Sequence, residues 1–279
     1  MRPRAPRLGP WLLLVAAVVL AGPLTRAQPR SAADFTIEQV KSYPYPAGLT
    51  AAATGARIAW TFNERGQRNI WVAEAPAWSA RRLTSYAADD GQELTSVSIS
   101  SDGRHVIYVR GGDHGSNWDD EVPVNPAGAL TPSPVQIWTV PFAGGEPVAI
   151  GEGANPVVSP RGDRVAFERD RQVWVVPADG SSPARRLFSQ RGTNGSPQWS
   201  PDGSRLAFVS ARGTHAFIGV YTDERTPIAW LAPSTSRDLS PRWSPDGSRI
   251  AFVRRPGVGG APEPVLERRH QPWGIWVTR

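Results

Sequence analysis

The sequence predicts an all-β fold, a β-propeller of four-stranded blades, and three observations carry this prediction. A turn motif containing glycine recurs five times, and apolar residues lie at fixed positions around each copy. The 28 prolines and 27 glycines are spread along the 279 residues. Many short strands separated by tight turns follow from such a pattern, and the recurrence indicates a repeat architecture. A β-sandwich is the remaining structural alternative.

Five turn glycines define the repeat, and they are Gly55, Gly103, Gly162, Gly203 and Gly247. An aliphatic residue follows each glycine by three positions and an aromatic residue by five, so on a strand both share one buried face. The last two copies are nearly identical, WSPDGSRLAFV at 199–209 and WSPDGSRIAFV at 243–253. In Ser-Pro-Asp-Gly, proline presets the first turn position and glycine takes a positive φ, which predicts a hairpin.

Two more strands are expected after each hairpin. Aliphatic–aromatic pairs mark the third strand, and they are Ile70-Trp71, Ile137-Trp138, Val173-Trp174 and Ile275-Trp276, with Phe217-Ile218 in the fourth copy. A short strand ending in Arg-Leu, at Arg82-Leu83 and Arg186-Leu187, completes four strands per unit. The glycines stand roughly 40 to 60 residues apart, close to the length of a propeller blade. The predicted propeller covers 46–279, with blades at about 46–92, 93–152, 153–193, 194–237 and 238–279, the last incomplete.

The N-terminal segment predicts a signal peptide over residues 1–27, followed by a lead-in over 28–45. Arg2, Arg4 and Arg7 precede an apolar run of 12 residues from Trp11 to Gly22, and small residues then favour cleavage after Ala27. The alternative is an uncleaved anchor, but a spanning helix needs about 18 to 20 apolar residues. We therefore expect a secreted or periplasmic protein without a membrane span after cleavage.

Charge and cysteine content exclude several function classes. Residues 1–27 hold four of the 31 basic residues and no acid, so the rest carries 27 basic against 25 acidic residues, a net charge of +2. No basic run interleaved with aromatic residues is found, so we expect no nucleic-acid partner. The chain has no cysteine, which excludes disulfides and thiol catalysis.

No catalytic, cofactor-binding or metal-binding residue is expected. A hydrolase nucleophile would stand in Gly-x-Ser-x-Gly, and the nearest match, 180–184, has proline where a helix should begin. The four histidines, His105, His114, His215 and His270, lack the spacing of metal ligands.

One loop is the candidate substrate or partner site. The connection between the second and third strands of the second blade is much longer than in its neighbours, and its notable side chains are His114, Asn117, Trp118, Asp119, Asp120 and Glu121. The fifth blade has a similar excess at 257–271, on the same face. Loops on rigid scaffolds carry function, so we interpret these acids as partners for the free amine of a peptide. The alternative is an ordinary solvated loop.

The repeat WSPDGSRIAFV resembles that of the periplasmic TolB protein and of the N-terminal domains of prolyl oligopeptidase-family serine peptidases. TIEQVKSYPYP (36–46), RNIWVAEAP (68–76) and VRGGDHGSN (109–117) are similar to the start of exported, dipeptidyl-peptidase-like members. The resemblance covers 34–279. It implies a non-catalytic propeller portion that gates substrate access to an α/β-hydrolase domain absent from this chain, which would be cut short before that domain. The implied partners are a peptide substrate or the hydrolase domain. The alternative is a stand-alone TolB-like module that binds other periplasmic proteins.

Overall fold

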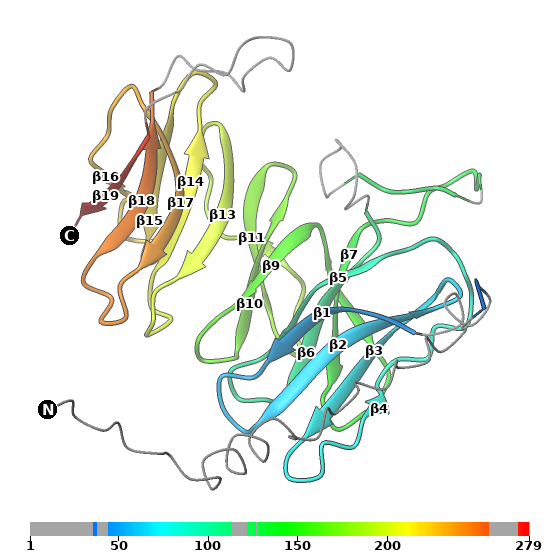
Figure 1. Cartoon of the computed structure of the whole chain (residues 1–279). Coiled ribbons are helices and arrows are strands. Elements are labelled where there is room, and N and C mark those ends of the chain that lie inside the picture. Colours follow the sequence, from blue (N-terminus) through cyan, green and yellow to red (C-terminus); the bar gives the residue numbers. More distant parts are fainter. Residues whose placement is uncertain (1–35, 38–43, 113–121, 127, 257–272, 279) are drawn as a thin grey trace, which may run out of the picture. The chain divides into compact units, whose positions relative to one another are not determined.

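The structure is a computed structural model that describes residues 36–37, 44–112, 122–126, 128–256 and 273–278. The chain divides into two units, Met1–Val40 and Lys41–Arg279. Within the first unit, only Thr36 and Ile37 are described. The described part of the second unit contains nineteen strands (Figure 1). Among the described residues, no helix is long and apolar enough to cross a membrane.

The first three blades are separate four-stranded antiparallel meanders. The first contains β1 (Tyr45–Ala51), β2 (Arg57–Glu64), β3 (Gln67–Glu74) and β4 (Arg81–Arg82). The second contains β5 (Leu94–Ile99), β6 (His105–Arg110), β7 (Gln136–Pro141) and β8 (Val148–Glu152). The third contains β9 (Ala154–Val158), β10 (Arg164–Arg169), β11 (Gln172–Pro177) and β12 (Arg185–Arg186).

The remaining strands form one continuous seven-stranded sheet that is two blades joined by a single bridge. The fourth blade contains β13 (Thr193–Trp199), β14 (Leu206–Ala211), β15 (Ala216–Tyr221) and β16 (Ala229–Leu231). The fifth contains β17 (Arg237–Trp243), β18 (Ile250–Arg255) and β19 (Gly274–Thr278). The bridge is one parallel pair, Ala216 with Arg237, between β15 and β17. The predicted all-β fold of four-stranded units is thereby confirmed, and the sheets follow one another in chain order (Figure 1).

The repeated aromatic residue packs each blade against the one before it. Tyr108 is fully buried in a cluster with Ile70 and Val72 of the first blade, and Phe208 is fully buried with Val173 and other residues of the third. The small or aliphatic residue beside each aromatic points the other way, as in Ile107, which packs toward the third blade. Alternation along a strand therefore gives each central strand two buried faces.

The five turn glycines all adopt a positive φ, as the hairpin prediction requires, with values between 68° and 86°. A serine hydroxyl on each of the last four turns donates to the turn aspartate, and the pairs are Ser100–Asp102, Ser159–Asp163, Ser200–Asp202 and Ser244–Asp246. The third turn reads Ser-Pro-Arg-Gly-Asp, so its aspartate follows the glycine and still caps the turn. The same hydrogen bond therefore survives a change in residue order.

The first strand of every blade contains a β-bulge that was not predicted from the sequence. The register shifts once in the pairing of each first strand with its second strand. A residue with positive φ lies near each shift, and these residues are Gly48, Ser96, Asn155, Ser196 and Ser240. A bulge inserts one extra residue and bends the strand, so the alternation of side chains changes face there. Four of the five residues are not glycine, which explains why no glycine pattern revealed the bulge.

Three arginines, which we call the clamp arginines, tie consecutive blades together. Arg57, Arg164 and Arg205 each donate from a terminal nitrogen to the carbonyl of the turn glycine in the next blade, at 2.7, 3.1 and 2.7 Å. Each guanidinium also lies over an aromatic ring, at 4.6 to 4.8 Å from its centroid. His105 occupies this position in the second blade, and its Nδ1 is buried without a hydrogen bond among the described residues.

The two ends of the sheets carry different connections. In an antiparallel meander, the turns between strands one and two and between strands three and four lie at one end. The connections between strands two and three, and those leading to the next blade, lie at the other. We call this second end the connection face. The clamp arginines belong to the first end, and the site described below belongs to the connection face.

Candidate functional site

The loop predicted as a binding site falls largely outside the described residues. His114, Asn117, Trp118, Asp119, Asp120 and Glu121 all lie within 113–121. The strands on either side of the loop, β6 ending at Arg110 and β7 beginning at Gln136, have these ends at the connection face. The second long connection, 257–272, also lies outside the description. The role given to these acids remains a prediction.

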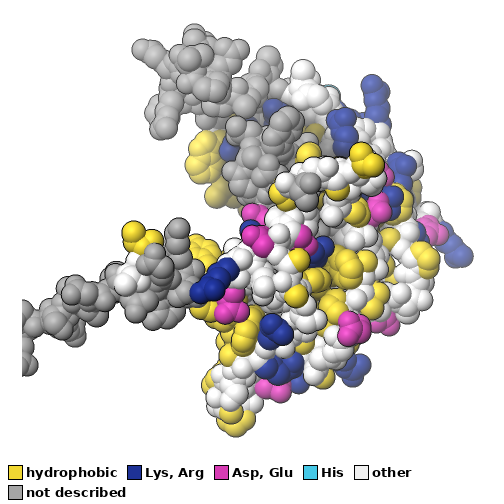
Figure 2. Space-filling view, turned by 90° about the vertical axis from the view of Figure 1, so that its right-hand side faces the viewer, with side chains coloured by type: hydrophobic (Ala, Val, Ile, Leu, Met, Phe, Trp, Pro, Cys, Tyr) yellow, Lys and Arg dark blue, Asp and Glu magenta, His cyan; other side chains and the backbone are white. Residues whose placement is uncertain are grey.

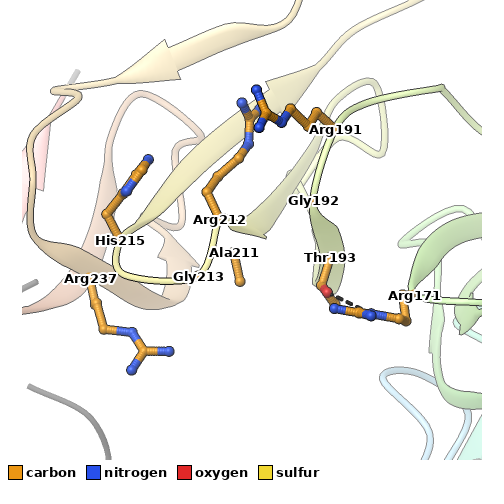
Figure 3. Close-up of a pocket in the computed structure, with 9 residues that line it drawn as sticks. All are labelled: Arg171, Arg191, Gly192, Thr193, Ala211, Arg212, Gly213, His215 and Arg237. Atoms are coloured by element: carbon orange, nitrogen blue, oxygen red, sulfur yellow. Dashed lines mark hydrogen bonds between the residues drawn. The ribbon is translucent and has the colours of Figure 1, made fainter.

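A basic pocket of about 540 Å³ lies on the same face, and sequence reasoning did not single it out. Figure 3 shows its lining, in which the charged or titratable side chains are Arg171, Arg191, Arg212, Arg237 and His215. They come from the β10–β11 and β14–β15 connections and from the starts of the fourth and fifth blades. Gly192, Thr193, Ala211 and Gly213 complete the lining. Four separate chain segments therefore place arginines around one cavity.

The bridge between the fourth and fifth blades brings these segments together. The backbone N–H of Ala216 donates to the carbonyl of Ser236 at 3.1 Å, beside the Ala216–Arg237 pair. One blade earlier, the N–H of Asn194 donates to the carbonyl of Arg171 at 2.9 Å. These two contacts hold the β10–β11 and β14–β15 connections against the start of the next blade. The pocket lies between the two contacts.

Two of the arginines are held through Nε, which leaves their terminal nitrogens available. The Nε of Arg171 donates to the hydroxyl of Thr193 at 2.9 Å, the dashed line in Figure 3. The Nε of Arg212 donates to the hydroxyl of Ser210 at 3.2 Å. No terminal nitrogen of either arginine has a hydrogen bond to another described residue. A guanidinium fixed at Nε still presents a planar pair of N–H donors, the geometry that a carboxylate accepts in a bidentate way.

Two aromatic rings contact the half-buried Arg212. Its guanidinium carbon lies 5.3 Å from the centroid of Trp230 and 5.8 Å from that of Phe217. The ring of His215 lies 4.9 Å from that of Phe217, measured between centroids. Such contacts attract the cation to the ring face and restrict the side chain. Arg212 is therefore positioned by the fold before any ligand is bound.

Elsewhere on the connection face, arginines pair with acids of the chain itself. Arg68, Arg110 and Arg169 form ion pairs with Asp89, Asp90 and Glu152, respectively. Arg254 forms a bidentate pair with the fully buried Asp238, at 2.7 and 2.8 Å.

Arg171, Arg191 and Arg212 differ, since none of them has a carboxylate within ion-pair distance among the described residues. The acids next to the pocket arginines in sequence point elsewhere: Asp170 pairs with Arg169, and Asp238 with Arg254. These three arginines thus bring positive charge to the pocket that no described carboxylate neutralises. Concentrated charge of one sign in a cavity raises the local concentration of ligands of the opposite sign.

Surface charge outside the pocket is mixed. On the face seen in Figure 2, hydrophobic side chains gather toward the middle, and basic and acidic side chains are interspersed around them. In the described part of the molecule, no group of three or more His, Asp or Glu residues could hold a metal ion. Gly180 adopts a positive φ, and the nearest match to the nucleophile motif, 180–184, lies in the connection between β11 and β12.

A second cavity, of about 500 Å³, belongs to the repeat. It is apolar and is lined by Leu49, Ile58, Trp60 and three neighbouring residues of the first blade. Trp60 occupies the position of Tyr108 and Phe208, the aromatic residue that packs against a preceding blade in the later copies. The cavity is therefore the counterpart of an interface between blades.

These features define the chain as a β-propeller of four-stranded blades, and comparisons relate it to known propellers. No family model matches. A TolB homolog of Chlorobium luteolum is 46% identical over 48 residues, covering 17% of this chain and 11% of the relative. A TolB homolog of Chlorobium chlorochromatii is 32% identical over 102 residues, covering 30% of this chain and 23% of the relative. The matches thus span less than a quarter of either relative.

Solved structures give the same fold. A prolyl endopeptidase structure superposes with a TM-score of 0.55 at 11% identity, covering 77% of this chain and 33% of that one. The β-propeller domain of the Trilobed protease from Pyrococcus furiosus, described as having an open velcro topology, gives a TM-score of 0.53 at 13% identity. That match covers 85% of this chain and 69% of that domain. At such low identity the likeness concerns the fold alone.

Proposed function

We propose that this chain is an exported, non-catalytic propeller that binds a segment of another protein on its connection face. The observation that carries the proposal is the basic pocket, where positioned arginines present donors that the described chain does not use. The sequence similarity to TolB homologs supports the comparison with a stand-alone propeller. The signal-like residues 1–27 support export, to the periplasm or beyond.

Binding, rather than catalysis, suits the chemistry of the pocket. Its lining supplies guanidinium groups, one imidazole, one hydroxyl and backbone amides. Arginine is always protonated, so it recognises anions without acting as a proton acceptor. Arg171 and Arg212 lie in short connections between paired strands, and a hydroxyl holds each guanidinium through Nε, so the fold restricts both binding groups.

A peptide selection with site-specific crosslinking tests this function. The photoreactive residue p-benzoylphenylalanine would replace Thr214, which is exposed on the connection face, or Ser182, which is exposed in a turn at the opposite end. A random twelve-residue peptide library is then incubated with each variant and irradiated. We expect enrichment of peptides crosslinked at position 214 and not at 182. Equal enrichment at both positions, or none, would contradict binding on the connection face.

A second candidate function is the gating of a serine peptidase domain, as the sequence resemblance implied. The observation that favours it is the fold likeness to propellers of a prolyl endopeptidase and of the Trilobed protease. The native exported protein would be detected with an antibody against residues 194–253 and treated with a fluorophosphonate probe. A labelled species well above 30.2 kDa supports gating. An unlabelled species near that mass supports the stand-alone module.

A further inference from the structure

We infer that the ligand of the basic pocket is an acidic polypeptide segment that brings at least two carboxylates. This inference rests on the proposed function and specifies the chemistry of the partner. It concerns the pocket around Arg171, Arg191 and Arg212, and not the acidic loop predicted from the sequence, which would favour the opposite charge.

Two arginines of the pocket have terminal donors that no described residue uses. Arg171 and Arg212 are each anchored through Nε to a hydroxyl, and their terminal nitrogens make no hydrogen bond within the described residues. Each can therefore take one carboxylate in a fork-to-fork pair without first breaking an existing contact. Charge-assisted bidentate pairs are about twice as strong as neutral hydrogen bonds.

Positive charge is distributed around the cavity. Figure 3 shows Arg171 with Thr193 on one side and Arg237 with His215 on the other, and Arg191 and Arg212 extend between them. A single small anion would neutralise one part of such a lining and leave the rest. Carboxylates spaced along an extended chain would reach several of the arginines at once.

The pocket favours a peptide over a nucleic acid. Protein surfaces that bind single-stranded nucleic acids carry an extended basic track with stacking aromatic rings. Here the rings of Phe217 and Trp230 are in cation–π contact with Arg212. Charge around the hydrophobic side chains in Figure 2 is mixed, and residues 28–279 carry a net charge of only +2. An open cavity of about 540 Å³ suits a few side chains of a peptide.

Fluorescence anisotropy with labelled peptides and the full chain tests the inference. The first peptide carries Glu at alternate positions of twelve, and the second replaces every Glu by Gln; both have amidated C-termini. We expect the Glu peptide to bind about tenfold tighter or more. Raising the salt concentration from 50 to 300 mM should remove most of this difference, because exposed charges are screened.

Variants assign the binding to the pocket. We expect the double variant Arg171→Gln/Arg212→Gln to lose about tenfold or more in affinity for the Glu peptide. Arg212→Lys keeps the charge but loses the fork, so it should lose several-fold. The matched control is Arg225→Gln, an exposed arginine at the other end of the sheets that removes the same charge. Unchanged thermal unfolding in each variant establishes that folding is intact.

The outcomes separate the two proposals. Equal binding of the Glu and Gln peptides, or pocket variants that behave like Arg225→Gln, would overturn the acidic ligand. Binding confined to inorganic phosphate or to an acidic oligosaccharide would overturn it as well. Neutral peptides crosslinked at position 214 would preserve the proposed function and reject the acidic specificity. Failure of the crosslinking selection, by contrast, is failure of the function itself.

Discussion

Arginine serves two ends of these sheets in opposite ways. At the end with the Ser-Pro-Asp-Gly turns, each clamp arginine (Arg57, Arg164 and Arg205) donates a hydrogen bond from a terminal nitrogen to a glycine carbonyl of the next blade. At the connection face, Arg171 and Arg212 are anchored through Nε and leave those same nitrogens free of described partners. One set of guanidinium groups holds the blades together, and the other set is available for a ligand.

The difference shows that the use of an arginine depends on which of its nitrogens the fold occupies. All basic residues except Lys41 are arginines, so composition alone cannot separate the two sets. Stability measurements should separate them. Replacing an arginine whose donors are in use leaves its buried acceptor without a hydrogen bond. Replacing the exposed Arg171 of the pocket should leave stability nearly unchanged.

The largest effect is expected where an arginine neutralises a buried acid. Arg254→Ala removes the bidentate partner of Asp238, whose exposed fraction is 0%. Leaving a buried charge unpaired costs about 3–5 kcal/mol. Urea unfolding should show this loss, and Arg171→Ala should stay within about 0.5 kcal/mol of the parent. Similar losses in both variants would erase the distinction between satisfied and available arginines.

Loss of one clamp should have the next largest effect. Arg205→Ala orphans the carbonyl of Gly247 and removes a cation–π contact with Trp243 at 4.7 Å. We expect a loss of about 1.5–3 kcal/mol in the free energy of unfolding. Arg249→Ala is the matched control, since Arg249 holds the same repeat position, is exposed, and has no side-chain hydrogen bond in the described region. A control as unstable as Arg205→Ala would contradict the clamp.

An arginine introduced at the clamp position of the second blade should also stabilise the protein. His105 stands at the clamp position with its Nδ1 buried and unbonded in the described structure. His105→Arg supplies a donor for the carbonyl of Gly162 in the next blade and should stabilise the protein by about 0.5–1 kcal/mol. The thermal midpoint measures this change, with His105→Ala as the comparison. If the thermal midpoint of His105→Arg is no higher than that of His105→Ala, the geometry of this blade differs from that of the blades with a clamp arginine.

The smallest effect concerns pH at the turns. The hydroxyl of Ser244, with donors on Ser248, lowers the pKa of Asp246 to about 2. A carboxylate with a lowered folded-state pKa contributes stability above its unfolded pKa, about 4. This contribution is lost as the pH falls through about 2. Urea midpoints measured between pH 5 and pH 2 should therefore decline, and less steeply in Ser244→Ala. Identical slopes in both proteins would exclude this turn as a source.

The sequence predicted the fold far better than it predicted the candidate functional site. The Gly-centred repeat and its apolar positions are local patterns, and they predicted the strands around Trp71, Trp138 and Trp174 as the structure has them. The bulges at Ser96, Ser196 and Ser240 were not predicted because serine, unlike glycine, gives no sequence signal of a positive φ. The candidate loop was predicted to be a binding site from its length and its acidic residues, and these residues lie outside the part of the chain that the structure describes.

The basic pocket could not be read from the sequence, because its arginines are scattered singly over 171–237 and each looks like an ordinary turn residue. By itself, the sequence determined the four-stranded repeat, the turn chemistry and the order of the blades, since these depend on residues close together in the chain. Only the tertiary structure decided which arginines meet and which are neutralised. Pairing β15 with β17 and packing successive blades bring distant segments together, and that proximity is set by contacts between blades rather than by spacing along the chain.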